Sequence, residues 1–216
     1  MSIRSIILAF LFMVCLINVC VGETVELTYY TIKGSIKKYV DSNIEEITFG
    51  KTSNVISVSG LEKLKNLKKV TFSMTAYIAD FSFLNANKNM EVLVFQDCSL
   101  PDNSFLYEQK NLKILALQGC RNISPIKLNA LPKLEYFEIS NSGIKELPVI
   151  LHGPLENLKI VNLAFNKIAS LDSTLLNYFS KCTIIMTGNP FTLQKPNISY
   201  AYLFDILPEK YHFLIR

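Results

Sequence analysis

The stretch LKIVNLAFNKIASL, residues 158–171, carries the spacing of apolar residues that decides the fold. Apolar side chains occupy its first, fourth, sixth, eleventh and fourteenth places, and an asparagine occupies the ninth. An amphipathic helix would repeat about every 3.6 residues and a half-buried strand every two residues, so neither period fits the whole stretch. The stretch is therefore neither one helix nor one long strand.

The same spacing occurs seven times along the chain, at steps of 22 to 24 residues. The first places of the seven copies are Ile44, Leu67, Met90, Leu112, Leu134, Leu158 and Lys181. The fourth and sixth places are apolar in every copy, and only the seventh copy is degenerate at its first place. Such regularity predicts a repeat protein, in which each copy is one structural unit stacked on the next.

Over residues 44–191 the pattern resembles the leucine-rich repeat family, and the return segments 78–84 and 123–126 are similar to those of internalin-like repeats. The resemblance implies an α/β solenoid: a right-handed coil with a parallel concave sheet, short 3-10 or irregular convex segments, and a cap at each end. In such a coil the first, fourth and sixth side chains of each repeat point into the interior.

The ninth place of each repeat is expected at a corner, where backbone polar groups turn away from the sheet and need partners. A small side chain with a hydrogen-bond donor can supply them, coil after coil. The chain has such residues at all seven ninth places: Thr52, Thr75, Cys98, Cys120, Ser142, Asn166 and Asn189. We therefore interpret Asn166 as a structural brace and not as a catalytic residue.

Cys98 and Cys120 hold the same place in adjacent repeats, so their backbones are expected about 5 Å apart. That distance permits a disulfide, but side chains stacked on parallel neighbours rarely reach the required dihedral angle. Buried thiols are the favoured interpretation. Together with Cys182 they make three cysteines after residue 22, which does not indicate a disulfide framework.

The first 22 residues predict export. Arg4 precedes an apolar run at residues 6–21, whose length is typical of a signal peptide and short for a spanning helix. Cleavage is expected after Gly22, and the alternative is a lipid anchor at Cys20, in a stretch that faintly resembles a bacterial lipobox. The expected organisation is a signal peptide at 1–22, an N-terminal cap at 23–43, the repeat array at 44–191 and a C-terminal cap at 192–216.

Each cap is expected to close one apolar end of the coil. In the N-terminal cap, residues 25–29 alternate as a strand, and residues 35–40 predict a short helix that buries Ile36, Tyr39 and Val40. In the C-terminal cap a helix is expected to begin at Asn197, which also opens a glycosylation sequon whose use depends on the source organism.

No residue pattern predicts catalysis, a metal or a cofactor. His152 and His212 have no Cys, Asp or His at ligand spacing, and the chain lacks a phosphate loop or a nucleophile elbow. Asp80 resembles a structural residue of the family, and loop carboxylates usually satisfy turns. The net charge of +4, or +3 without Arg4, is scattered, which argues against nucleic acid. We expect a chain that is not an enzyme and has no spanning segment after signal cleavage.

The concave side of the expected sheet is the candidate contact surface, because its side chains are polar at the ends of the array and apolar in the middle. A contiguous apolar patch with a polar rim marks a contact surface, although β-branched residues also suit strands without any ligand. The candidate partner-binding residues are Val92, Val94, Ile114, Tyr136, Glu138, Ile160, Asn162 and Phe165.

These expectations combine into an exported, non-enzymatic protein-binding module, secreted or held at the cell surface. A protein partner is favoured, because an extended concave surface lacks the deep pocket that small molecules need. The alternative is a structural or self-associating surface protein, in which the apolar column is a seam between copies.

Overall fold

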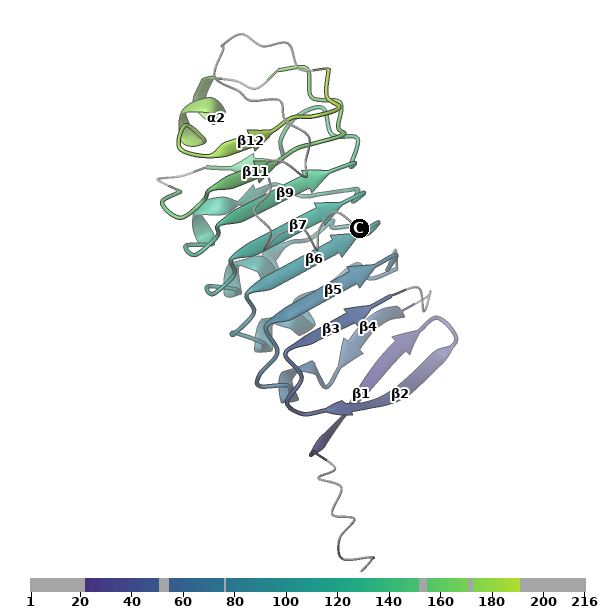
Figure 1. Ribbon diagram of the computed structural model, residues 1–216. Coiled ribbons are helices and arrows are strands. Elements are labelled where there is room, and N and C mark those ends of the chain that lie inside the picture. The colour runs from purple at the N-terminus through teal and green to yellow at the C-terminus, as the bar shows by residue number, and fades with distance from the viewer. Residues whose placement is uncertain (1–21, 51–54, 76, 152–154, 171–172, 191–216) are drawn as a thin grey trace, which may run out of the picture.

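The structure, a computed structural model, describes residues 22–50, 55–75, 77–151, 155–170 and 173–190. Within them the chain forms a solenoid in which each repeat contributes one strand to a parallel sheet (Figure 1). The strands are β3 (Glu46–Phe49), β5 (Lys69–Ser73), β6 (Val92–Gln96), β7 (Ile114–Gln118), β9 (Tyr136–Ser140), β11 (Ile160–Asn162) and β12 (Thr183–Ile185). They follow one another across the sheet in this order, as the solenoid requires.

The register predicted from the repeats is confirmed by the strand pairing. Residues at the same place of consecutive repeats lie side by side throughout the sheet. The fourth places, for example, pair in the order Ile47, Val70, Leu93, Leu115, Phe137, Val161 and Ile184. Since side chains alternate along a strand, the fourth and sixth places share one face of the sheet and the third and fifth share the other.

The main core fills the interior of the coil as one apolar cluster that runs from Val25 to Met186. At the sixth place, Phe49, Phe72 and Phe95 form a stack whose ring centroids lie 5.0 and 5.4 Å apart. Phe81, from a return segment, packs edge-on against two of these rings. Such burial contributes about 1.5–3 kcal/mol for each large apolar side chain.

The return segments contain the short 3-10 helices that the sequence predicted. They are η1 (Leu61–Lys63), η2 (Ser82–Ala86), η3 (Ser104–Glu108) and η4 (Leu128–Ala130), with one α-helix, α2 (Ser173–Tyr178), beside the last strand. A two-stranded parallel sheet joins β8 (Ile126–Lys127) and β10 (Val149–Ile150) on this side. The Asp80 carboxylate accepts hydrogen bonds from the Ser82 N–H and hydroxyl at 2.7 and 2.9 Å, so it satisfies the turn that begins η2.

The N-terminal end of the coil is covered by a three-stranded antiparallel sheet of β1 (Thr24–Thr31), β2 (Gly34–Asp41) and β4 (Val55–Ser59). The expected helix at residues 35–40 is therefore wrong, because these residues pair with β1 along the whole length of β2. Ile36 and Tyr39 are exposed instead of buried, and Val40 is half-buried. Strand pairing overrides the helical spacing here, since it supplies backbone partners and suits β-branched and aromatic residues. The cap sheet also takes β4 from the first repeat, so it extends beyond residue 43.

Several residues singled out from the sequence lie outside the described part of the chain. They are residues 1–21 with Cys20, the ladder residue Thr52, His152, and the C-terminal cap with Asn197 and His212. Among the residues that the structure does describe, no helix is long and apolar enough to cross a bilayer. The same residues contain no group of three His, Cys, Asp or Glu side chains placed to hold a metal ion.

Candidate binding surface on the concave face

The concave face is the side of the seven-stranded sheet opposite to the main core. Its middle carries a second apolar cluster, contributed by third, fifth and seventh places of neighbouring repeats. The members are Val94, Ile114, Ala116, Tyr136, Ile160, Ala164 and Ile185, with Val92 packed against them. The strands thus bring together the apolar residues that the sequence assigned to this face.

The expectation that these residues are exposed is wrong. Six of the eight candidate partner-binding residues are buried, with at most 9% of their surface exposed: Val94, Ile114, Tyr136, Glu138, Ile160 and Asn162. Val92 is half-buried, and only Phe165, at 52%, is largely exposed. The alternation of a strand fixes the direction of a side chain but carries no information about what lies over that face, so the pattern could not predict the burial.

Glu138 is buried in the middle of this cluster and accepts hydrogen bonds from three neutral donors. The Tyr136 hydroxyl donates at 2.8 Å, the Ser140 hydroxyl at 2.6 Å and the Gln118 amide at 3.3 Å. Burial raises the pKa of Glu138, and the three hydrogen bonds oppose that shift in part. The network continues on both sides, because Gln96 donates to Gln118 at 3.0 Å and Asn162 donates to the Tyr136 hydroxyl at 3.2 Å. A polar line therefore crosses the apolar surface from β6 to β11.

Burial on the concave face is low at the N-terminal end of the array and greatest in its middle strands. At the fifth place Thr48 of β3 is exposed and Thr71 of β5 is half-buried. From β6 to β12 every fifth-place residue is buried: Val94, Ala116, Glu138, Asn162 and Ile185. The composition of the third place follows the same course: it is Glu46 and Lys69 in the first two strands, apolar in the next four, and the exposed Thr183 in β12. The buried surface thus centres on the strands from β7 to β11.

The eighth places of the second to seventh repeats form one rim of this face and adopt a left-handed backbone conformation. Positive φ values between 50° and 74° occur at Met74, Asp97, Gly119, Asn141, Phe165 and Gly188. The sequence reasoning missed this feature, although two glycines, an asparagine and an aspartate at one place indicate it. Met74 and Phe165 are the exceptions: both are bulky, apolar and about half exposed. The Phe165 ring lies over Gly188, where an added Cβ would come within 2.6 Å of its Cδ1.

At the ninth place, four side chains donate to the sixth-place carbonyl of the preceding repeat. Cys98 donates to Phe72, Cys120 to Phe95, Asn166 to Ile139 and Asn189 to Leu163, at 3.6, 3.4, 2.7 and 2.7 Å. The Thr75 hydroxyl lies 3.2 Å from the Cys98 sulfur, and the Ser142 hydroxyl accepts from the Cys120 N–H at 3.0 Å. Cys98 and Cys120 are unbridged, and burial raises the pKa of the Cys120 thiol to about 12. These contacts join one coil to the next and leave both thiols protonated at neutral pH.

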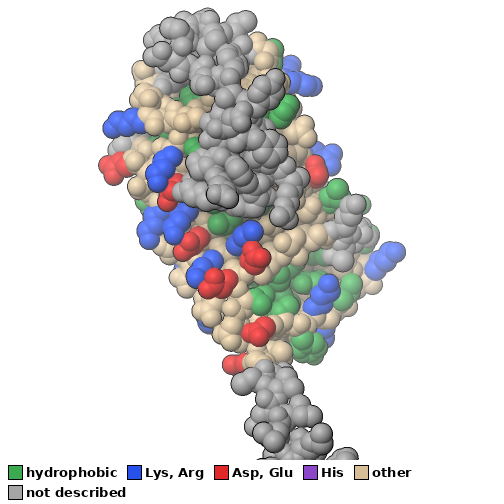
Figure 2. Space-filling model, viewed as in Figure 1, with side chains coloured by type: hydrophobic (Ala, Val, Ile, Leu, Met, Phe, Trp, Pro, Cys, Tyr) green, Lys and Arg blue, Asp and Glu red, His purple; other side chains and the backbone are tan. Residues whose placement is uncertain are grey.

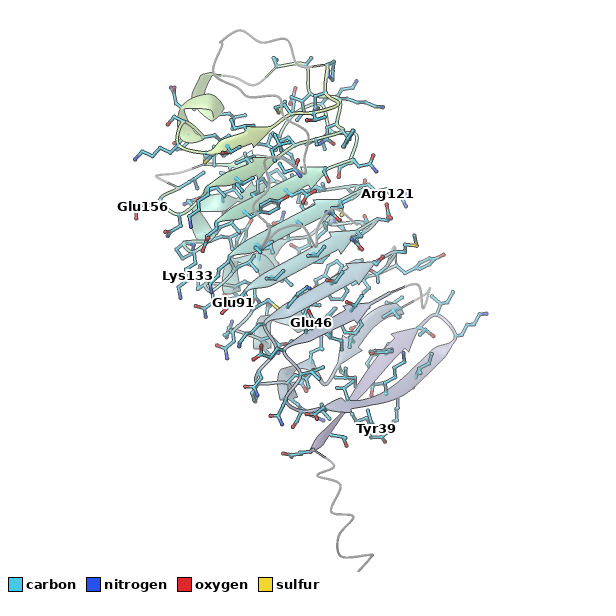
Figure 3. The ribbon with its side chains drawn as sticks, in the orientation of Figure 1. Tyr39, Glu46, Glu91, Arg121, Lys133 and Glu156 are labelled. Carbon is cyan, nitrogen blue, oxygen red and sulfur yellow. The ribbon has the colours of Figure 1, made fainter. Side chains whose placement is uncertain are left out.

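A column of alternating charge follows the second place, where the chain enters each strand. From the first to the sixth repeat it reads Glu45, Lys68, Glu91, Lys113, Glu135 and Lys159. Ion pairs join these residues two by two, at 2.7, 2.8 and 2.9 Å. Figure 3 places Glu91, Lys133 and Glu156 along this edge of the solenoid and Arg121 on the opposite edge. The charged edge and the rim of eighth places therefore bound the concave face on its two sides.

No family model matches the sequence, and neither does any curated protein. Among solved structures the chain is similar to TLR13 in its complex with ssRNA13, with a TM-score of 0.50 and 19% identity over 71% of this chain and 26% of that one. The repeat period, the parallel sheet and the hydrogen bonds of the ninth-place residues at the corners agree with that likeness. This chain has the leucine-rich repeat fold.

Two bacterial structures are also similar to this leucine-rich repeat chain. An internalin from Listeria monocytogenes matches with a TM-score of 0.45 and 18% identity over 72% of this chain and 52% of that one. A leucine-rich repeat protein from Leptospira interrogans matches with a TM-score of 0.48 and 16% identity, over 68% and 44% of the two chains. The leucine-rich repeat chain therefore spans about half the length of these two proteins or less.

Proposed function

We propose that this leucine-rich repeat chain is a non-catalytic protein-binding module of an exported protein, and that it holds a polypeptide on its concave face. The observation that carries the proposal is the second apolar cluster, which includes Ile114, Tyr136 and Ile160 and is separate from the main core. A solenoid closes around its interior core alone, so it does not need a further apolar set on the opposite face of the sheet. Contiguous apolar surface with a polar border is typical of contact surfaces.

The shape and chemistry of the face favour a polypeptide over a small molecule. Seven strands at about 4.8 Å spacing give a surface on the order of 30 Å long, which is extended where a small-molecule site would be a compact pocket. The line from Gln96 through Gln118 to Glu138 offers amide and carboxylate groups that can pair with a peptide backbone. Phe165 and Met74 add exposed apolar side chains at the rim.

Substitutions at this rim test the binding proposal without disturbing the core. Phe165→Asp and Met74→Asp each replace an exposed apolar side chain by a residue that tolerates the left-handed conformation. Lys145→Glu, at an exposed position on the return side, is the matched control. Each variant is used to capture partners from a cell-surface extract, and captured proteins are quantified by mass spectrometry. We expect a rim variant to lose a partner by about tenfold or more, as anchor residues of interfaces do, while the control keeps it. Loss with Lys145→Glu alone would move the contact surface to the convex side.

Export is supported by the sequence of the first 22 residues, where one positive charge precedes a short apolar run. Mass spectrometry of the mature N-terminus tests it directly. We expect the mature chain to begin at Glu23, and a lipidated Cys20 would establish the anchored alternative. A chain that retains Met1 and the apolar run would contradict export through a cleaved signal.

Self-association is the second candidate function, and the N-terminal cap sheet is the observation that favours it. Five of the large exposed apolar residues lie on this sheet or its hairpin turn: Tyr30, Ile32, Ile36, Tyr39 and Ile56. Apolar side chains gather over this end of the molecule in Figure 2, and β2 is an exposed edge strand. Exposed edges can pair with a second copy, although Lys37 and Lys38 on β2 oppose such pairing. Light scattering at rising concentration distinguishes the two functions, since only self-association predicts a growing mass.

A further inference from the structure

The strand β2 presents a free edge at the N-terminal end of the solenoid. In the described part of the chain it pairs with β1 alone, and it is the outermost strand of the cap sheet in Figure 1. Seven of its eight residues are exposed, and the eighth, Val40, is half-buried. The backbone groups on the outer side of β2 can therefore pair with another strand.

The turn of the hairpin determines which backbone groups face this edge. Thr31 and Gly34 are partners across a two-residue turn, and such a turn is closed by a hydrogen-bonded pair. Hydrogen-bonded and non-hydrogen-bonded pairs alternate along an antiparallel ladder, so every second residue of β2 directs its N–H and C=O away from β1. The Asp41 carbonyl also accepts from the Ile44 N–H at 3.4 Å, which leaves it a second lone pair. The residues with outward backbone groups are Ser35, Lys37, Tyr39 and Asp41.

The two lysines of β2, which would oppose pairing at this edge, are held over β1. Lys37 Nζ lies 3.0 Å from the Glu26 carboxylate on one face of the cap sheet. Lys38 Nζ lies 5.3 Å from the centre of the Tyr29 ring on the other face. Both of these partners belong to β1, on the side of β2 away from the free edge. Lysines protect an edge strand by bringing charge to it, and here β1 draws both ammonium groups away.

The charges of β2 are complementary to those of a second copy in one register. Two antiparallel strands related by a two-fold axis place one residue opposite its own copy. An axis at Lys37 or Lys38 sets two lysines directly opposite each other, which is unfavourable. An axis at Tyr39 instead sets Lys37 opposite Asp41 of the second copy, and the symmetry makes this contact twice. The Lys37 ammonium has three donors, so it can pair with that aspartate and with Glu26 together.

The register with its axis at Tyr39 also suits the backbone and the aromatic side chain at the edge. Residues with outward backbone groups then lie opposite residues with outward backbone groups, as the hydrogen bonds of a ladder require. Tyr39 is 66% exposed in the single chain, and in this register its ring meets the ring of the second copy. Aromatic pairs across antiparallel strands stabilise a sheet, so the pairing gives this exposed ring a partner.

We infer that two copies of this chain associate by antiparallel pairing of their β2 strands, with the two-fold axis at Tyr39. The two cap sheets then form one six-stranded sheet, from which the two solenoids extend. The inference rests on the second candidate function, self-association, and does not depend on what the concave face holds. The pairing covers residues 37–41 of each strand, whereas a standard interface has about 20–30 residues a side, so we expect a weak, concentration-dependent dimer.

Charge reversal in the mature chain tests the register. Lys37→Glu and Asp41→Lys each set like charges opposite one another, so each variant alone should raise the dimer dissociation constant by about tenfold or more. An equimolar mixture of the two variants restores opposite charges in both pairs, and it should associate about as tightly as the wild type. Lys145→Glu makes the same change of charge on the return side and should leave the constant unchanged. Sedimentation equilibrium between about 1 µM and 1 mM protein provides the measurement.

The mixture also controls for folding, because only folded variants can associate with each other. A mixture that associates as weakly as the separate variants would overturn the inference. Association that both separate variants retain at wild-type strength would overturn it too, while self-association through another surface would stand. A wild-type chain that stays monomeric at every concentration would contradict both the inference and self-association, and would leave the proposal for the concave face unaffected.

A cysteine at the axis measures the same contact without a change of charge. Tyr39→Cys is made in a chain that also carries Cys182→Ser, because Cys182 is only half-buried. Opposed residues of a hydrogen-bonded pair have Cα atoms about 5.5 Å apart, within the range of a disulfide. Oxidised glutathione is the oxidant, and each disulfide formed between two copies reduces it to two glutathione thiols.

Ser35→Cys is the matched control, since it is exposed on the same strand and has the same backbone direction. In the inferred register the two copies of this residue lie eight places apart, or about 27 Å along the strands. We expect Tyr39→Cys to form the linked dimer at least about tenfold faster than Ser35→Cys, because its thiols are held opposite each other. Equal rates would show that the copies meet in no fixed register and would overturn the inference.

Discussion

Asn166 joins the backbones of two adjacent repeats at one corner of the solenoid. Its amide donates to the Ile139 and Leu163 carbonyls at 2.7 and 3.0 Å, and its carbonyl oxygen accepts from the Ser142 N–H at 2.9 Å. The side chain is 5% exposed, so water cannot replace these bonds once the amide is removed. The asparagine therefore contributes to stability through the groups that it keeps paired.

We expect Asn166→Ala to lower the free energy of unfolding by about 1–3 kcal/mol, because it leaves buried backbone groups without partners. Asn157→Ala is the matched control: its amide also donates to a carbonyl of the preceding repeat, Pro132, at 2.8 Å, but it is exposed. The control should change stability by no more than about 0.5 kcal/mol. Urea denaturation measures the free energy of unfolding of both variants. Equal losses of stability would show that the buried hydrogen bonds of Asn166 contribute no more than the exposed bond of Asn157.

Glu138 makes stability depend on pH in a direction that differs from most carboxylates. Its pKa is raised in the folded chain by burial, so between the ordinary glutamate pKa of 4.5 and the raised pKa the folded state binds more protons than the unfolded state. Stability contributed by this group therefore falls as pH rises through that window.

We expect Glu138→Gln to remove this decrease of stability with rising pH, so that the variant becomes more stable relative to the wild type as pH increases. The side-chain oxygen of the introduced glutamine can still accept hydrogen bonds from Ser140 and Gln118. Its side-chain nitrogen can donate to the Tyr136 hydroxyl, which also accepts a hydrogen bond from Asn162. Urea denaturation of both proteins at a series of pH values measures the difference. A difference that stays constant with pH would contradict a buried, titrating Glu138.

At the scale of the elements, the alternating column of second-place charges favours the stacking of each strand on its proper neighbour. Lys113 lies between Glu91 and Glu135 on adjacent strands, and it pairs with Glu91 at 2.8 Å. Like charges directly opposite each other in a sheet are destabilising, so reversal of one charge affects both neighbours.

We expect Lys113→Glu to lower the melting temperature by about 2–5 °C at low salt, and Lys113→Ala by less than about 2 °C, because exposed pairs contribute little. The difference between the variants should shrink in 0.5 M NaCl, where the charges are screened. Scanning calorimetry at both salt concentrations provides the measurement. A difference that does not respond to salt would indicate lost packing of the lysine stem and not lost charge.

The repeat pattern predicted strand positions, register and inward-facing residues, because each depends on side-chain spacing that recurs from copy to copy. It failed at residues 35–40, where pairing with β1 decides the conformation, and on the concave face, because the alternation along a strand carries no information about what lies over that face. It also missed Asn87 and Gln109, buried on the return side, whose amides donate to the Leu61 and Leu84 carbonyls at 2.8 and 3.0 Å. Both stand where three other repeats have a leucine, three residues before the first place.

At the scale of the whole molecule, the main core is continuous from the N-terminal cap to the last described strand. Leu27 of β1 and Met186 after β12 belong to the same apolar cluster, although repeats contact only their neighbours. Strand pairing joins adjacent coils at every step from β3 to β12, and ladder bonds and ion pairs add to it at several steps. Strong coupling between neighbours makes a short array unfold as one unit, whereas weak coupling lets its ends melt separately.

We therefore expect one cooperative unfolding transition, with the same midpoint by far-ultraviolet circular dichroism and by tyrosine fluorescence. Leu27→Ala deletes a fully buried side chain of the cap and should cost about 2–5 kcal/mol. Because the cap is coupled to the array, this variant should shift both signals together to lower urea concentration, with an unchanged slope. Ile56→Ala, on the exposed side of β4, is the control and should leave the midpoint nearly unchanged. If Leu27→Ala instead produced an early transition for a fraction of the signal, the cap would be an independent unit that shields the array without stabilising its distant end.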